Sequence, residues 1–315
     1  MTWRILNAES TGYSGKALEI LRQCGTVENA DLNRQELQKR IKNHEALIIR
    51  LGHQIDAEIL NAAPKLKTIV TATTGLNHID LAETEKRGIT VLSLRGEREF
   101  LETISATAEH TFGLILALIR KIPGANCDVA AGRWNRDAFK GQELAGKTLG
   151  IIGYGRLGKI VARYAAAFGM NILAHDPQPS DEVRFVSLDQ LLQQSDIISL
   201  HAAYTPETEN MINATCFSQM KQGAYFINTA RGELVDESAL LHALQTGHLA
   251  GAALDVLRGE YSGRANWAKK DPLIRYAQKN DNLIITPHIG GATTDSMEKT
   301  EIFMANKLKK FIESF

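Results

Sequence analysis

The stretch Lys147-Thr-Leu-Gly-Ile-Ile-Gly-Tyr-Gly-Arg-Leu-Gly-Lys159 decides how this chain folds. A short apolar run leads into the glycine turn G-x-G-x-x-G at residues 153–158, and a helical pattern follows the turn. In such a turn the first glycine permits a sharp bend, the second lets a diphosphate approach the backbone, and the third lets the helix pack on the strand. The N–H groups at the start of the helix then face the phosphates. The stretch predicts a dinucleotide-binding βα unit, although an ordinary capped turn also fits a lone motif of this kind.

The residues after the turn favour one dinucleotide over another. A second apolar strand, residues 170–174, leads to Asp176, which lies 18 residues after Gly158. A carboxylate at this position accepts a hydrogen bond from a ribose 2′-hydroxyl and repels a 2′-phosphate. Pro177 and Gln178 follow, and no arginine is adjacent. The sequence therefore predicts NAD rather than NADP as the cofactor.

Composition excludes several classes of protein. The chain has 315 residues, with 36 Lys and Arg against 36 Asp and Glu, so the balance of charge indicates no nucleic-acid partner. Cys24, Cys127 and Cys216 form neither a metal-binding nor a disulfide pattern. No apolar run reaches membrane-spanning length, and the first residues do not resemble a signal peptide. We expect a cytoplasmic protein without a metal ion and without a membrane partner.

Strand and helix patterns alternate along the chain, which is long enough for two domains. In the first hundred residues we expect strands at 3–6, 46–49, 68–72 and 89–92, and helices at 16–21, 35–41, 57–62 and 81–87. After Asp176 we expect strands at 196–200, 225–228, 251–254 and 282–287, and helices at 188–194 and 236–245. This alternation predicts an α/β protein with parallel sheets that are covered on both faces.

Three longer segments connect these parts. Residues 101–121 are mostly apolar up to Pro123, which cannot continue a helix interior, so we expect one helix that joins two domains. We interpret residues 124–140 as an arm that covers a partner subunit. The amphipathic segment 293–315 is expected to return to the first domain.

Polar residues follow the predicted strands of the second half. Arg231, Asp255 and His288 each fall at the carboxyl end of a strand, where ligands bind in sheets of this type, and Glu260 follows closely. Arginine holds a carboxylate with two parallel hydrogen bonds, and histidine exchanges protons near neutral pH. A glutamate beside the histidine would fix its orientation. These residue types suit hydride transfer to a 2-keto acid, in which the cofactor carries the hydride.

Each of these residues also has a purely structural interpretation. His288 alone fits a loop histidine that is bonded to backbone, Arg231 fits a surface arginine, and Asp255 fits a turn cap. His201 ends the strand at 196–200 and fits a structural residue or one at the edge of the cofactor. Their coincidence at one edge of a sheet favours function.

The first half carries its own candidates. Arg50 follows the strand at 46–49, and a loop with Thr74 and Gly75 follows the strand at 68–72. Gly75 lets backbone N–H groups approach a carboxylate, whereas Arg50 fits a substrate contact and a solvated charge equally well.

Four motifs follow one another in order between residues 153 and 293. They are Gly153-Tyr-Gly-Arg-Leu-Gly158, Asn228-Thr-Ala-Arg-Gly-Glu-Leu-Val-Asp236, Ala253-Leu-Asp-Val256 and Thr286-Pro-His-Ile-Gly-Gly-Ala-Thr293. Shorter matches lie at 107–111 and 132–134. Together the motifs resemble those of the D-isomer-specific 2-hydroxyacid dehydrogenases, and in particular the phosphoglycerate-dehydrogenase-like branch.

The resemblance implies a fold, a reaction and an assembly. The fold would be α/β with two doubly wound parallel-sheet domains. A Rossmann-type NAD-binding domain (101–289) would be inserted in a flavodoxin-like substrate domain (1–100 and 290–315). The reaction would transfer a hydride between NAD and C2 of a D-2-hydroxy acid or 2-keto acid. The assembly would be a homodimer.

The resemblance also implies residue roles. Arg231 would bind and polarise the substrate, and Glu260 would pair with His288, the general acid/base. Thr74 and Gly75 would offer backbone donors to the substrate carboxylate. Arg50 stays a further candidate on the ground of its place after the strand at 46–49. The residues expected to contact NAD are Gly153, Tyr154, Gly155, Arg156, Leu157, Gly158, Asp176, His201, Thr208, Thr229, Ala230, Arg231, Asp255, His288, Gly290 and Gly291.

Some positions depart from the usual pattern and keep alternatives open. Ala203 and Tyr204 stand where proline and leucine are usual, and Tyr261 replaces the proline after Glu260. The segment 261–281 is longer than usual and carries the basic and aromatic residues Arg264, Trp267, Lys269 and Lys270. These residues leave a 3-phosphoglycerate-like substrate open. An NAD(H)-sensing regulator or scaffold on the same fold is an alternative from another class, because fold alone does not decide function.

Overall fold

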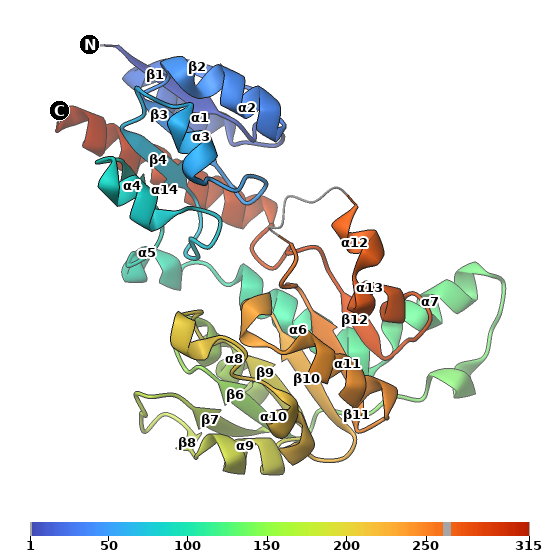
Figure 1. The fold of residues 1–315 in the computed structure, drawn as a ribbon. Helices are drawn as coiled ribbons and strands as arrows, with labels where there is room; N and C mark the ends of the chain where they lie inside the picture. The colour runs from blue at the N-terminus through green and yellow to red at the C-terminus, as the bar shows by residue number, and fades with distance from the viewer. Residues whose placement is uncertain (1, 261–265, 315) are drawn as a thin grey trace. The chain divides into compact units, whose positions relative to one another are not determined.

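The computed structural model describes residues 2–260 and 266–314. The chain divides into two compact units, and the first contains residues 2–104 and 292–314 of the described chain (Figure 1). The second contains residues 105–260 and 266–291. Each unit is built on a sheet in which every strand pairing is parallel, so the predicted α/β class is confirmed.

The sheet of the first unit has the strand order β2-β1-β3-β4-β5. Its strands are β1 (Trp3–Asn7), β2 (Gly25–Asn29), β3 (Ala46–Ile49), β4 (Thr68–Thr71) and β5 (Thr90–Leu92). This order, 2-1-3-4-5, is the flavodoxin-like one that the resemblance implies. The edge strand β2 was not predicted, because its residues are half-exposed and form no apolar run.

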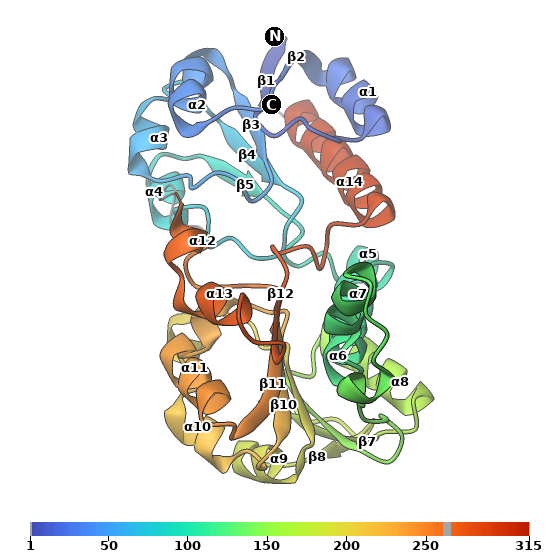
Figure 2. The same ribbon diagram turned by 90° about the vertical axis from the view of Figure 1, so that its right-hand side faces the viewer.

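Helices cover both faces of this sheet (Figure 2). Leu6 and Leu47 point to the face covered by α2 (Arg34–Arg40) and α3 (Ala57–Asn61). Ile5 and Ile48 point to the opposite face, where α1 (Gly15–Cys24) packs beside α14 (Thr294–Glu313). The remaining helices of the unit are η1 (Ile41–Asn43), α4 (Leu81–Lys86) and α5 (Arg98–Glu102). The expected return of the last helix to the first unit is therefore observed.

The sheet of the second unit has the strand order β12-β11-β10-β9-β6-β7-β8. Its strands are β6 (Thr148–Ile152), β7 (Asn171–His175), β8 (Arg184–Phe185), β9 (Ile197–Leu200), β10 (Ala224–Asn228), β11 (Leu249–Leu254) and β12 (Leu283–Ile285). The order reverses at β6, which pairs with both β7 and β9. This is the Rossmann order, and ligands bind at the carboxyl ends of the strands next to such a reversal.

Helices lie on both faces of the second sheet as well (Figure 2). One face carries α6 (Ala106–Ile119) and α8 (Arg156–Ala167), and α7 (Ile122–Ala130) continues from α6. The other face carries α9 (Leu188–Gln194), α10 (Ala214–Gln219), α11 (Glu237–Gln245) and α13 (Pro272–Ala277). Shorter pieces are η2 (Arg136–Phe139), η3 (Pro206–Thr208), η4 (Gly232–Leu234) and α12 (Trp267–Lys270). Among the described helices, none is long and apolar enough to cross a membrane.

The predicted single helix at 101–121 is wrong. The chain forms α5 up to Glu102 and begins α6 only at Ala106. Pro123 does not end the helical region, because it lies in the first turn of α7, where its missing N–H removes no helical hydrogen bond. The break between α6 and α7 lies instead at Lys121, whose φ of 53° is left-handed.

The C-terminal helix contributes to the core of the first unit through Leu308, which is fully buried. We expect Leu308→Ala to lower the free energy of unfolding by about 2–5 kcal/mol, because the change removes apolar contacts and leaves a cavity. Urea denaturation followed by circular dichroism measures this. The control is Lys310→Ala, an exposed position on the same helix that should change stability by less than about 0.5 kcal/mol. An equally small effect at Leu308 would contradict this packing.

Candidate functional site

The three glycines of the turn after β6 differ in their surroundings. Gly153 has φ +92°, and a Cβ there would lie 2.5 Å from the backbone nitrogen of Ala202. A Cβ on Gly158 would lie 2.3 Å from the carbonyl oxygen of Gly153. Both positions therefore require glycine for the fold itself. Gly155 is exposed, and no described atom lies within 4 Å of its Cβ position, so open space adjoins the start of α8. Such an open cradle at a helix start fits a diphosphate.

Asp176 joins the end of β7 to the glycine turn. Its Oδ2 accepts a hydrogen bond from the N–H of Tyr154 at 2.8 Å, and its Oδ1 accepts one from the N–H of Gln178 at 2.8 Å. The carboxylate is half-exposed. The structure therefore places Asp176 beside the turn, at the position where the sequence predicts a ribose contact.

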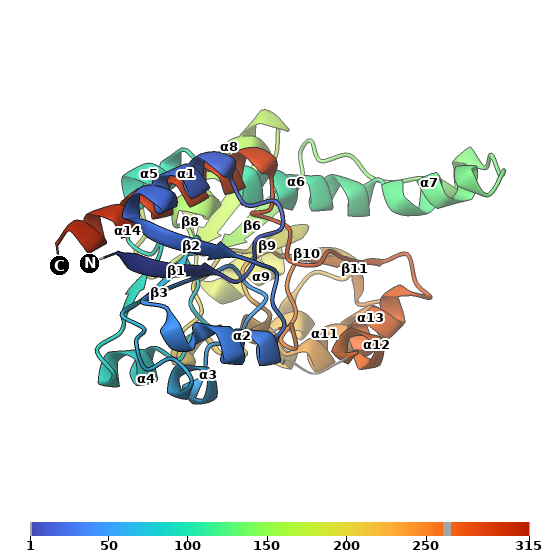
Figure 3. The ribbon, with the colours of Figure 1, turned by 90° about the horizontal axis from the view of Figure 1, so that it is seen from above.

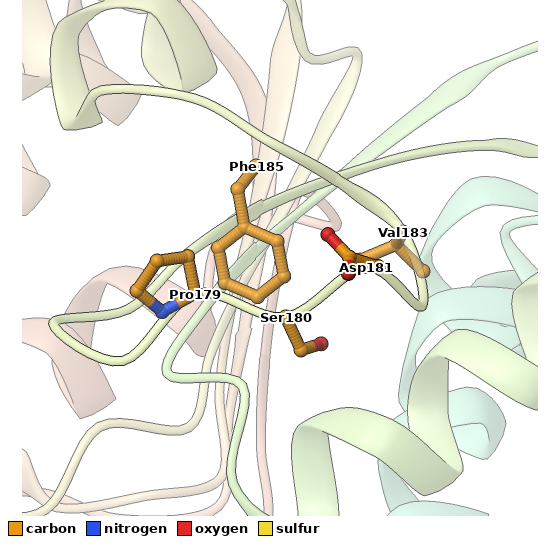
Figure 4. A pocket seen from close by; sticks show the side chains of 5 residues that line it. All are labelled: Pro179, Ser180, Asp181, Val183 and Phe185. Atoms are coloured by element: carbon orange, nitrogen blue, oxygen red, sulfur yellow. The ribbon is translucent and has the colours of Figure 1, made fainter.

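A shallow recess of about 420 Å³ lies just beyond Asp176 in the chain (Figure 4). Its lining residues are Pro179, Ser180, Asp181, Val183 and Phe185. The Phe185 ring forms its wall and meets the ring of Tyr154 edge-on at 5.2 Å. None of the predicted site residues lines this recess.

His201 follows β9 and faces the same turn. Its Nε2 shares a hydrogen bond of 2.8 Å with the Ser199 hydroxyl, and its N–H donates to the carbonyl of Ile152. Burial lowers the pKa of His201 to about 4, so the ring is neutral at physiological pH. The chain provides no partner for its buried Nδ1 among the described residues. A neutral ring of this kind suits a cofactor contact better than proton transfer.

Asp255, at the end of β11, fastens the loop after β12. Its Oδ1 accepts hydrogen bonds from the Thr286 hydroxyl at 2.6 Å and from the N–H of Ile289 at 2.8 Å. Its Oδ2 accepts the N–H of Gly290 at 2.7 Å, and its backbone carbonyl accepts the N–H of His288. The side chain is 1% exposed. The loop 286–290 is therefore folded around one buried carboxylate.

His110 on α6 reaches the same carboxylate. Its Nε2 lies 3.2 Å from Asp255 Oδ1 and 3.0 Å from the Thr286 hydroxyl oxygen. Burial acts to raise the pKa of Asp255, but the hydrogen bonds from His110, Thr286 and the two loop amides outweigh it and hold the pKa below its ordinary value. The carboxylate is thus ionised throughout the neutral range.

His288 and Glu260 meet at the carboxyl edge of β11 and β12. Nδ1 of His288 lies 2.9 Å from Oε2 of Glu260, and the two side chains are 20% and 13% exposed. His288 has φ 54°, a left-handed conformation that its loop, fastened by Asp255, imposes. The structure brings together the two residues that the sequence predicts as an acid/base pair.

Arg231 follows β10 in a loop that Asn228 organises. The Asn228 side chain accepts the N–H of Ala230 at 2.9 Å and donates to the carbonyl of Arg231 at 2.9 Å. The Arg231 guanidinium donates from Nη1 to the carbonyl of Ala230 and is half-exposed. Thr111 donates its hydroxyl proton to Thr107, so Thr229 is the donor in the 2.9 Å bond between the Thr229 and Thr111 hydroxyls.

The remaining predicted cofactor contacts lie in the second unit. The Thr208 hydroxyl closes its own turn by donating to the carbonyls of Ala203 and Thr205. A Cβ at Gly290 would lie 2.9 Å from Asp255 Oδ2, whereas Gly291 is open. Arg156 and Leu157 begin α8 and are half-buried, and burial lowers the pKa of Arg156. Tyr261 and Arg264, where the sequence departs from the usual family pattern, lie outside the described residues.

The predicted substrate residues of the first unit differ in whether they already bond to other parts of the chain. Arg50 follows β3 and ion-pairs with Glu301 of α14, a side chain that is 2% exposed. Thr74 and Gly75 follow β4, and within the described chain their N–H groups have no hydrogen-bond partner. The structure leaves the loop at 74–75 open and commits Arg50 to an internal contact.

Sequence reasoning did not single out His110, Thr286 or Asn228. His110 and Thr286 lie inside the motifs at 107–111 and 286–293, and Asn228 begins the motif at 228–236. The motifs were therefore a signal for these residues, but a pattern cannot show which of its side chains contact each other.

A class of protein follows from this geometry: a dinucleotide-binding α/β protein with a histidine–carboxylate pair at the carboxyl ends of its Rossmann strands. Residues 112–290 match the family described as D-isomer specific 2-hydroxyacid dehydrogenase, NAD binding domain. The chain therefore belongs to the D-isomer specific 2-hydroxyacid dehydrogenases, an enzyme family, which confirms the resemblance and NAD as the family's cofactor.

Relatives and solved structures support the same family. A D-3-phosphoglycerate dehydrogenase of Archaeoglobus fulgidus is 39% identical over 97% of this chain and 56% of its own length. A hydroxypyruvate reductase of Thermotoga maritima is 37% identical over 90% of both chains. The crystal structure of D-lactate dehydrogenase from Aquifex aeolicus, complexed with NAD and lactic acid, has a TM-score of 0.86 at 32% identity and covers 99% of this chain and 96% of that one. The chain spans about half the length of the first of these relatives.

The Asp255 carboxylate should stabilise the second unit measurably. Asp255→Asn is expected to lower the free energy of unfolding at pH 7 by about 1–3 kcal/mol, because an amide offers one acceptor oxygen where two loop N–H groups need separate oxygens. Since the folded pKa is depressed, this contribution is present above the unfolded value of about 3.9 and is lost as the pH falls through the lower folded value. Chemical denaturation between pH 7 and pH 3 measures both effects.

The matched control for this prediction is Asp189→Asn, an exposed aspartate in the first turn of α9. Its effect should stay within about 0.5 kcal/mol. A stability difference between wild type and Asp255→Asn that did not shrink in acid would contradict the role assigned to the carboxylate.

Proposed function

We propose that this protein is an NAD-dependent oxidoreductase that transfers a hydride between nicotinamide and C2 of a D-2-hydroxy acid or 2-keto acid. The observation that carries the proposal is the His288–Glu260 contact of 2.9 Å at the carboxyl ends of β11 and β12, in a unit that matches an NAD-binding domain. The names of the relatives, which include D-3-phosphoglycerate dehydrogenase and hydroxypyruvate reductase, support the reaction type. The particular acid is a separate question, and the sequence leaves a 3-phosphoglycerate-like substrate open.

NAD, when bound, supplies the hydride acceptor in oxidation and NADH the hydride donor in reduction. The open space at Gly155 and the start of α8 fit its diphosphate, and Asp176 fits the adenosine ribose. Thr229, Ala230 and His201 lie at the ends of β10 and β9 and would complete the contacts.

His288 would exchange a proton with the oxygen on C2. Because Nδ1 is hydrogen-bonded to Glu260, we assign the exchanged proton to Nε2. The Glu260 carboxylate would orient the ring and stabilise its protonated form. Asp255 would act indirectly, by fixing the left-handed backbone at His288 through the loop amides.

Arg231 would hold the substrate carboxylate and polarise the carbonyl through its guanidinium. The Asn228 contacts hold the backbone at Ala230 and Arg231, so the loop that carries the guanidinium is fixed by the chain itself. For the first unit, we propose Thr74 and Gly75 as backbone donors to a substrate carboxylate, because their N–H groups have no partner in the described chain. Arg50 is not included, because its guanidinium is already bonded to Glu301.

An NAD(H)-sensing regulator on the same fold stays the alternative from another class. The half-buried contact between His288 and Glu260 favours catalysis, because a sensor has no need for an oriented acid/base pair.

The reaction is tested by NADH oxidation with a panel of 2-keto acids. We expect at least one acid to be reduced, and His288→Ala to lower its kcat/KM by about 10²–10⁴-fold, because the proton donor is lost. NADH binding, followed by nicotinamide fluorescence, should persist in the variant. His242→Ala, an exposed histidine on α11, is the control. Tight NADH binding without turnover of any acid would favour the sensor, and full activity in His288→Ala would remove its assigned role.

We further propose that the protein forms a homodimer through the arm formed by α7 and the residues that follow it. Ile122, Val129 and Trp134 are 52%, 51% and 88% exposed. Figure 3 shows α7 extending away from the strands of the second unit. Exposed apolar residues clustered on one segment are typical of an interaction surface, and a second copy of this chain is the partner that the family resemblance implies.

The arm makes this assembly testable. Sedimentation analysis of the wild type should give twice the monomer mass, and Trp134→Asp should shift the equilibrium towards the monomer by about 10-fold or more, because a buried charge weakens a packed interface. Leu81→Asp, at a 38% exposed position of the first unit, is the control. A monomeric wild type would overturn the proposal.

A further inference from the structure

We propose that Glu9 and Glu301 restrict the substrate to acids with a single anionic group, so that an unphosphorylated 2-keto acid is preferred over its phosphorylated counterpart. This inference rests on the proposed function and concerns the first unit alone. It follows from how the carboxyl ends of β1, β3 and β4 are occupied.

The loop after β3 carries an arginine whose charge is already neutralised. Nε and Nη2 of Arg50 both donate to Oε1 of Glu301, at 3.0 and 2.5 Å, and Nη1 donates to the carbonyl of Thr11 at 2.8 Å. Each nitrogen of the guanidinium is therefore committed to the chain. The group also lies over the ring of Tyr13, at 5.6 Å from the centroid.

Glu301 cannot readily release this arginine. Its side chain is 2% exposed, and its second oxygen accepts the N–H of Ser14 at 2.7 Å. Removing the arginine from the pair would leave a buried carboxylate without its countercharge, which is strongly unfavourable. Burial, reinforced by the charge of Glu301, also raises the pKa of Tyr13 and keeps its phenol neutral.

The backbone amides of the same loop are occupied as well. Oε2 of Glu9 accepts the N–H of Arg50 at 2.6 Å, and Oε1 accepts the N–H of Gly52 at 2.9 Å. The chain thus places its own carboxylate on the two amides that an incoming anion would use. The charge of Glu301 neutralises that of Arg50. The carboxylate of Glu9 therefore gives this loop a net negative charge.

The loop after β4 offers a contrast. The hydroxyl of Thr73 donates to the carbonyl of Gly75 at 2.8 Å and so closes the loop from within. The N–H groups of Thr74 and Gly75 have no partner in the described chain. The backbone donors of the loop after β4 are therefore open for a carboxylate. Those of the loop after β3 are occupied by Glu9, and the arginine of that loop is occupied by Glu301. A second anionic group would meet the negative charge of Glu9.

The test compares two substrates that differ only by a phosphoryl group. Hydroxypyruvate and 3-phosphohydroxypyruvate are reduced with NADH, and we expect kcat/KM to be at least about 10-fold higher for hydroxypyruvate, because like charges at close range repel strongly. Glu9→Gln should move this ratio by about 10-fold towards the phosphorylated acid, since it removes the uncompensated charge. Glu301→Gln, which frees the Arg50 charge, should move the ratio in the same direction.

The control is Glu298→Gln. This residue lies on the same helix as Glu301, pairs with Lys16 and is 41% exposed, so the substitution removes an equal charge without touching Arg50. Its ratio should match the wild type. Because the readout is a ratio between two substrates, a general loss of activity in a variant does not affect it. If Glu301→Gln fails to fold, Glu9→Gln still decides the question.

Binding without turnover separates this inference from the proposed function. Calorimetry with NAD and either D-glycerate or D-3-phosphoglycerate measures the same preference when no reaction occurs. Preference for glycerate without turnover of any keto acid would refute only the proposed function. Preference for the phosphorylated acid, in turnover or in binding, would overturn the inference alone. Binding of neither acid would overturn both.

Discussion

The candidate site depends on one buried carboxylate. Asp255 is the point at which the end of β11, the loop after β12 and helix α6 are joined by hydrogen bonds from Ile289, Gly290, Thr286 and His110. A charge buried to this extent is tolerable only when it is fully hydrogen-bonded, so the loop has little freedom to adopt another conformation. The position of His288 against Glu260 is a consequence of this arrangement.

The glycine turn at residues 153–158 is also held in one conformation by a carboxylate and by close packing. Gly153 and Gly158 are required by close backbone approach, and Asp176 ties the turn to β7 through the N–H of Tyr154. Among the three glycines of the turn, only Gly155 has no described atom within 4 Å of its Cβ position. Two glycines thus serve the fold, and the third leaves the space that we propose for the cofactor diphosphate, although all three belong to a single motif.

The sequence predicted the strands that have continuous apolar runs and the polar residues at their ends, because both follow from burial and from the direction of parallel strands. It missed β2, whose half-exposed residues carry no such run, and it placed a helix end at Pro123, where a new helix begins. It also could not show that Arg50 is paired with Glu301, which lies 251 residues further along the chain. A local pattern identifies a charged residue, but only tertiary structure shows whether that charge is already compensated.

The discontinuous first unit has a consequence for biosynthesis. Ile5, Ile48 and Val70 lie under α14, and Leu308 of that helix follows the whole of the second unit in the chain. Both α1 and α14 pack on this face of the N-terminal sheet. Until α14 has been synthesised, α1 alone covers the face, and the part that α14 will cover is exposed. The second unit, by contrast, is complete in the nascent chain before α14 is synthesised. The first unit is therefore expected to finish folding after the second, and a nascent chain stalled before α14 would present an apolar surface to chaperones.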